Sequence, residues 1–156
     1  MRIAIVGEAH SREAVEIYAG ATAALDGVFC EGWRRKFGTL PRDLSEWGIW
    51  YEREHRCHPD NPDDDELTCS EERFATLPEM LRMRDRGQGA DCDDIAPAHC
   101  ALLRAHGIDP KARVKVIDVP SGNYHVVVLR GNGAIDDACG RLGMPMPTAA
   151  NIRKAG

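Results

Sequence analysis

The sequence lacks the cysteine pattern that marks structural zinc sites and thioredoxin-like redox pairs. It has six cysteines, but no Cys-x-x-Cys occurs. Their spacing is irregular and we find no secretory signal, so we interpret them as thiols rather than as a disulfide framework. They stand at Cys30, Cys57, Cys69, Cys92, Cys100 and Cys139.

Long apolar runs and basic runs are also missing. The opening "MRIAIVGEAH" is broken by Glu8, and no later segment reaches the roughly 18 apolar residues of a membrane span. Acidic residues outnumber basic ones 25 to 20, for a net charge of −5, and no basic stripe is present. With 156 residues, we expect one soluble, cytoplasmic domain with no membrane span and no nucleic-acid partner.

The N-terminal part contains no nucleotide-binding loop. "IAIV" at 3–6 is a candidate strand, and apolar residues at helical spacing predict a helix over 11–26, or one long helix. The intervening "VGEAHSR" has neither the three glycines of a dinucleotide loop nor a Gly-Lys-Ser/Thr. We therefore predict no cofactor. Further on, Trp47, Trp50 and Tyr51 recur at helical spacing, which favours core packing over a binding wall that would also include Trp33.

The segment 57–69, "CHPDNPDDDELTC", is acidic and contains two prolines, so we expect a solvated loop whose acidic part spans 60–66. A zinc site made of Cys57, His58 and Cys69 is a competing hypothesis. It supplies only three ligands at no recognised spacing, and the acidic run lacks the glycine and glutamate of a calcium loop. We assign no metal to the chain.

Helix signals return at 77–85, with Pro78 in the first turn, and at 91–105. Asp91 is a favoured N-cap, the next two acidic residues suit the positive end of the helix dipole, and Gly107 is a stop signal. Pro97 falls inside this second helix, where proline costs about 3 kcal/mol.

Beyond 110 the pattern changes to that of strands. We predict one strand at 112–119 and a hairpin of 123–130 and 134–137 around the turn "GNG". Alternation puts His125 on one face with Val127 and Leu129. Residues 145–156 read as an extended tail.

Along the chain, these elements place a cysteine at a helix N-terminus, then a histidine on a later strand, and then an acid after a hairpin. A thiol has a pKa of about 8.5, and both a helix N-terminus and an imidazolium lower it. Cys92, His125 and an acid at 136 or 137 therefore make a candidate acyl-transfer site. The acidic residues that flank Cys92 oppose ionisation of its thiol. Individually, a cysteine or a strand histidine is more often core packing.

The motifs "GADCDDIAPAHCALLRAHGI", "NYHVVV" and "GAIDDACGRLGM" resemble those of the transglutaminase-like, papain-like superfamily, especially its small bacterial and phage-encoded members. The resemblance covers 77–144 and is weak over 1–70. It implies Cys92 as nucleophile, His125 as general base and acid, and Asp137 as the residue that orients the imidazole. The resemblance favours Asp137 for that last role because it immediately precedes Ala138, where relatives usually have Asp-Pro, and Asp136 is the competitor. Gln88 is a candidate oxyanion donor beside the Cys92 N–H.

The resemblance implies an α+β fold in which N-terminal helices and the catalytic helix pack on a small antiparallel sheet. We expect a single domain over 1–144, with a helical part at 1–70 and the catalytic core at 77–144. The implied activity is that of a cysteine protease, amidase or transamidase acting on a protein or peptide. The alternative is a phage or prophage virion or assembly protein that keeps the fold for binding partner proteins.

Overall fold

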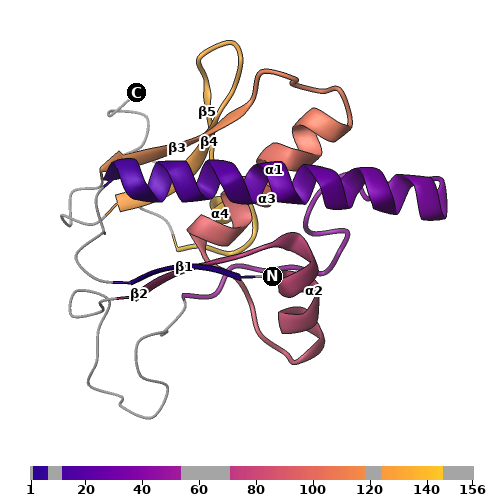
Figure 1. Cartoon of the computed structure of the whole chain (residues 1–156), viewed down its shortest axis with the longest axis horizontal. Helices are drawn as coiled ribbons and strands as arrows, with labels where there is room; N and C mark the ends of the chain where they lie inside the picture. The colour runs from indigo at the N-terminus through magenta and orange to yellow at the C-terminus, as the bar shows by residue number, and fades with distance from the viewer. Residues whose placement is uncertain (1, 7–11, 54–70, 119–123, 146–156) are drawn as a thin grey trace.

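A single long helix, α1 (Arg12–Phe37), crosses the front of the molecule in Figure 1. The computed structural model describes residues 2–6, 12–53, 71–118 and 124–145 of the chain. Over these residues α1 is followed by α2 (Leu77–Asp85), α3 (Cys92–Ala105) and the short α4 (Ala138–Arg141). Helices and antiparallel strands are both present, so the fold class is α+β.

The strands of the described ranges form two small antiparallel sheets. In Figure 1, β1 (Arg2–Val6) and β2 (Glu71–Ala75) pair below α1. The second sheet has the order β3 (Arg113–Asp118), β4 (Tyr124–Leu129), β5 (Ile135–Asp136). The predicted strand and hairpin near the C-terminus are therefore confirmed. The strand β2 was not predicted from the sequence.

The core has two main clusters that share α3. One lies between α1, α3 and the β3–β4 pair, and the other lies between α3, α2, α4 and the segment that follows α1. Along β4 the faces alternate as predicted: Val126 and Val128 belong to the first cluster, whereas Val127 packs with Ile117 and Ile135. Cys92 contacts both main clusters, so the start of α3 lies where they meet.

The N-terminal part departs from the expected set of helices, because its described residues contain one helix and a strand. The helix α1 continues to Phe37, well beyond the predicted end at 26. Buried Cys30 extends its packed face, and three basic residues in the last turn match the negative end of the helix dipole. The helix stops at Gly38, whose φ is +77°.

The predicted helical stripe at Trp47, Trp50 and Tyr51 is wrong, because these residues lie in turns and an isolated bridge. Gly48 has a φ of +71°, which a helix does not allow. Trp47 is nevertheless buried in the core, as expected of such a residue, whereas Trp50 is 37% exposed.

The other predicted helices are confirmed. Pro78 lies in the first turn of α2, and Gly107 follows α3 with a φ of +66°. Asp91 occupies the N-cap position of α3, although its side chain makes no capping hydrogen bond. The helix continues through Pro97, which lacks the N–H that would bond the Asp93 carbonyl.

Several predictions concern residues outside the described ranges, namely the acidic loop 60–66, the zinc hypothesis at Cys57, His58 and Cys69, and most of the tail 145–156. Among the described helices, none combines the length and apolar character needed to cross a membrane.

Candidate active site

Cys92 differs from the other cysteines that the structure describes. It is the first residue of α3 and is partly exposed, whereas Cys30, Cys100 and Cys139 are buried. Burial raises the pKa of the Cys30 thiol to about 12 and that of the Cys100 thiol to about 11, so both are protonated at neutral pH. Cys92 is thus the cysteine of the described ranges that combines solvent access with the positive end of a helix dipole.

His125 and Asp137 lie together at the end of the sheet. His125 is the second residue of β4 and only 2% exposed, and its Nε2 is 3.1 Å from Asp137 Oδ1. The contact is close but poorly aligned for a hydrogen bond, so the buried Nε2 has no hydrogen-bond partner among the described residues. A carboxylate this close to one imidazole nitrogen is the arrangement in which an acid can orient a histidine and stabilise its imidazolium.

Asp137 is held by the fold as well as by His125. Its side chain accepts a hydrogen bond of 3.1 Å from the Cys139 N–H and so caps α4. The acid therefore comes from a fixed helix start, and only 12% of its side chain is exposed.

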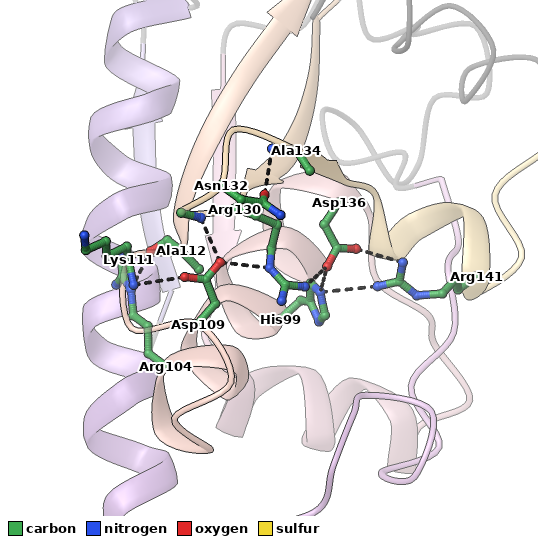
Figure 2. A network of polar contacts seen from close by, with 11 residues as sticks. His99, Arg104, Asp109, Lys111, Ala112, Arg130, Asn132, Ala134, Asp136 and Arg141 are labelled. Atoms are coloured by element: carbon green, nitrogen blue, oxygen red, sulfur yellow. Dashed lines mark hydrogen bonds and ion pairs between the residues drawn. The ribbon is translucent and has the colours of Figure 1, made fainter.

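Asp136, the competitor for the orienting role, points to a different set of partners (Figure 2). Its Oδ2 lies 2.9 Å from both His99 Nε2 and Arg130 Nη1, and its Oδ1 lies 2.8 Å from Arg141 Nη1. Arg130 continues the network to Asp109 at 2.9 Å. Burial on its own would raise the pKa of Asp136, but the bond and charge of His99 and the charge of Arg141 outweigh it and hold this pKa well below its ordinary value.

This network connects the helix of Cys92 to the hairpin of the acid. His99 lies on α3, two turns after Cys92, and Asp136 ends β5 immediately before Asp137. The His99–Asp136 contact is mostly buried, with the two side chains 10% and 13% exposed. The two adjacent aspartates thus serve different purposes: Asp136 anchors the hairpin to α3, and Asp137 faces His125.

Two of the acidic residues beside Cys92 have buried side chains. Asp93 and Asp94 are buried, and Asp94 Oδ1 accepts a hydrogen bond of 2.5 Å from the Ala75 N–H at the end of β2. A backbone N–H donor of this kind offsets part of the negative charge of a carboxylate, and here the donor belongs to β2. The strand β2, not predicted from the sequence, therefore forms part of the surroundings of the candidate nucleophile.

Residues 50–52 form a short strap that supports the loop leading into Cys92. Ala90 exchanges backbone hydrogen bonds with Trp50 and Glu52, at 3.0 and 2.8 Å. The Gly89 N–H donates to Glu52 Oε2 at 2.6 Å, and a Cβ on Gly89 would lie 2.7 Å from the Trp50 indole nitrogen. Trp50 therefore lies against the loop that precedes Cys92, whereas Trp47 belongs to the core.

Gln88 lies in the exposed turn between α2 and α3, and its N–H donates to the Met83 carbonyl at 2.9 Å. Its candidate role as oxyanion donor stays a prediction.

One residue of this region was missed by the sequence reasoning. Cys139 is fully buried, and its sulfur lies within 4.8 Å of ligand atoms of both His125 and Asp137. Burial raises the pKa of Cys139 well above the ordinary thiol value, and the neighbouring Cys92, Asp137 and Asp91 raise it further. The sequence feature that could have pointed to Cys139 is its position two residues after the candidate acid.

No protein-family model matches the chain, and no similar curated protein or solved structure was found.

Proposed function

We propose that the chain catalyses thiol-dependent acyl transfer on amide or peptide bonds. The observation that carries this proposal is the buried contact of 3.1 Å between His125 Nε2 and Asp137 Oδ1. This pair lies beside Cys139, whose thiol also experiences the charge of Cys92. Cys92, His125 and Asp137 then form a nucleophile, a general base and an orienting acid.

In the proposed reaction, Cys92 Sγ attacks the carbonyl carbon while its proton resides on His125. The tetrahedral intermediate collapses with cleavage of the C–N bond, and the imidazolium gives its proton to the departing amine. Water or a second amine then attacks the thioester, with His125 accepting a proton, and restores the Cys92 thiol. The N–H of Cys92 is an oxyanion donor, a role suited to the first turn of a helix.

The charges around Cys92 act in both directions. The N-terminus of α3 and a protonated His125 favour the thiolate, whereas Asp91 and Asp94, which raise the pKa of the neighbouring Cys139, oppose it. The bond from the Ala75 N–H to Asp94 moderates that opposition. A catalytic role requires the helix and the imidazolium to outweigh the acids.

An activated ester tests the proposal without knowledge of the natural substrate. We expect p-nitrophenyl acetate to give a burst of p-nitrophenolate and one acetyl group, found on Cys92 by peptide mass mapping. Hydroxylamine as amine acceptor should speed turnover if amines resolve the thioester, whereas hydrolysis leaves only acetate. Peptide amides are the next donors to examine.

The controls separate catalysis from simple thiol reactivity. Cys92→Ala should abolish the burst, and His125→Ala should slow it roughly 10²-fold or more, with little change in the melting temperature for Cys92→Ala. The buried Cys100 provides a matched variant, because Cys100→Ala should keep the burst. Acetylation shared among several cysteines, or a burst independent of His125, would refute the proposal.

A further inference from the structure

We infer that His125, Asp137 and Cys139 form a binding site for a zinc-like divalent transition-metal ion. The three side chains supply an imidazole nitrogen, a carboxylate oxygen and a sulfur, and these atoms all lie within 4.8 Å of one another. The inference shares two residues with the proposed acyl-transfer site, but it holds whether or not that site is catalytic.

The donor set suits such an ion. Zinc binds histidine nitrogen, cysteine sulfur and carboxylate oxygen, and three protein ligands with one open position are typical of its non-structural sites. Magnesium and calcium prefer oxygen ligands alone. A bound dication would also balance the Asp137 carboxylate and a Cys139 thiolate, which is otherwise a costly charge in a fully buried position.

The geometry leaves a place for the ion. His125 is 2% exposed, and its Nε2 lies 3.1 Å from Asp137 Oδ1 without an aligned hydrogen bond. The N–O separation of 3.1 Å is slightly shorter than the roughly 3.3–3.5 Å that bonds of about 2.0–2.2 Å subtend at a tetrahedral angle, so these two donors would move slightly apart to share one ion. The imidazole nitrogen is thus a buried polar atom whose hydrogen bonding is incomplete and whose neighbours are a carboxylate and a thiol.

The ligands are also held by rigid elements. His125 is paired to Ile117 within the sheet, Asp137 is the N-cap of α4, and Cys139 lies in the first turn of α4. The hydrogen bond from the Cys139 N–H to Asp137 fixes these last two residues relative to each other. Because the three donor atoms already lie within 4.8 Å of one another, small side-chain adjustments would bring them all to bonding distance of one ion.

A metal in this position would exclude acyl transfer. It would take the imidazole nitrogen that faces Asp137 and separate the base from its orienting acid. Zinc would therefore inhibit the proposed activity, and a chelator would restore it.

The test titrates the purified chain with Co²⁺, a spectroscopic probe for zinc sites. We expect one equivalent to bind with visible bands of a tetrahedral site and a near-ultraviolet thiolate-to-cobalt band, both lost when Zn²⁺ is added. Cys139→Ser should remove the thiolate band, and Asp137→Asn, which keeps an N-cap oxygen, should weaken binding at least roughly 100-fold.

Matched variants identify the ligands. The bands should persist in Cys100→Ser, a second buried thiol, in Asp91→Asn, which belongs to a separate group of three acids, and in Cys57→Ser with Cys69→Ser, which removes the other zinc hypothesis. No cobalt binding, or binding unchanged in both Cys139→Ser and Asp137→Asn, would overturn the inference. The two proposals are distinguished by Cys92→Ala, which should abolish the ester burst and keep the cobalt bands, whereas variants of His125 and Asp137, which the two sites share, should affect both readouts.

Discussion

At the scale of single residues, two adjacent aspartates have separate environments. Asp137 faces His125 and caps α4, whereas Asp136 contacts His99, Arg130 and Arg141. Backbone geometry explains the separation, because Asp136 ends β5, Asp137 follows it in an extended conformation, and consecutive residues of an extended chain point to opposite faces. The resemblance left both acids as candidates for orienting the imidazole, and the structure gives His125 a single one of them as neighbour.

Asparagine variants of the two aspartates should have different effects. Asp137→Asn should lower the rate of Cys92 acylation roughly 10²-fold, because the neutral amide stabilises the imidazolium poorly. Its melting temperature should change little, since asparagine also caps helices well. Asp136→Asn should instead cost about 1–3 kcal/mol of unfolding free energy by weakening bonds to charged partners. The acylation rate and urea unfolding of both variants measure these effects. A slower acylation in Asp136→Asn together with a loss of stability in Asp137→Asn would contradict the separate roles of the two aspartates.

At the scale of elements, the strap at 50–52 determines where the loop before α3 lies. Gly89 has no side chain, and a Cβ there would stand 2.5 Å from Glu52 Cβ and 2.7 Å from the Trp50 indole. A methyl group must therefore push the strap and the loop apart. The candidate nucleophile follows three residues later, so the displacement should reach the site.

We accordingly expect Gly89→Ala to destabilise the protein by about 1–3 kcal/mol and to slow Cys92 acylation. The matched control is Gly32→Ala, because Gly32 lies inside α1 and a Cβ there meets nothing within 4 Å. That change should be neutral or stabilising by up to about 1 kcal/mol. Thermal unfolding and the ester burst report the two effects. A Gly89→Ala protein as stable and reactive as the parent would show that the strap does not position the loop.

The elements differ in how well the sequence predicts them. The helix α3 and the β4–β5 hairpin have local signals, in the form of an N-cap, a glycine stop and the turn "GNG", and these signals were sufficient. The strand β2 has no alternation in "EERFA" and forms by pairing with β1, about 70 residues away in the chain. Its existence depends on a tertiary contact, which a local pattern does not contain.

The same distinction applies to the candidate site. The sequence was sufficient to identify Cys92, His125 and a following acid as candidates, because each lies near the end of a predicted helix or strand. The choice between Asp136 and Asp137 depends on side-chain direction after β5, and the contribution of Cys139 depends on how α4 folds back onto α3. These are packing outcomes, and the sequence reasoning did not anticipate Cys139.

At the scale of the whole molecule, a buried acid makes the stability depend on pH. Asp26 of α1 is fully buried, accepts a hydrogen bond of 2.6 Å from the Leu77 N–H, and has no hydrogen-bond partner at Oδ2 among the described residues. Burial raises its pKa from 3.8 to about 8, against the lowering effect of that bond. The folded protein therefore holds a proton at neutral pH that the unfolded chain has lost.

The sign of the effect follows from this difference in bound protons. The stabilisation from a protonated Asp26 is complete below its unfolded pKa of 3.8 and is lost as pH rises through about 8. Between these values its contribution to the unfolding free energy should fall by up to about 1.4 kcal/mol per pH unit. Asp26→Asn should remove this slope, so that the unfolding free energy of the variant rises relative to that of the parent protein between pH 6 and 9. Urea unfolding across that range measures it, and parallel curves would show that Asp26 is ionised in the fold.

The central claim, that Cys92 and His125 act as a thiolate–imidazolium pair, is tested most directly by the pH dependence of Cys92 alkylation. Iodoacetamide labelling with peptide mass mapping follows each cysteine, and Cys30 and Cys100 serve as internal standards because burial keeps them protonated. We predict an apparent pKa for Cys92 below the ordinary thiol value of about 8.5, which rises in His125→Ala. An apparent pKa at or above that value, unchanged in His125→Ala, would contradict the account.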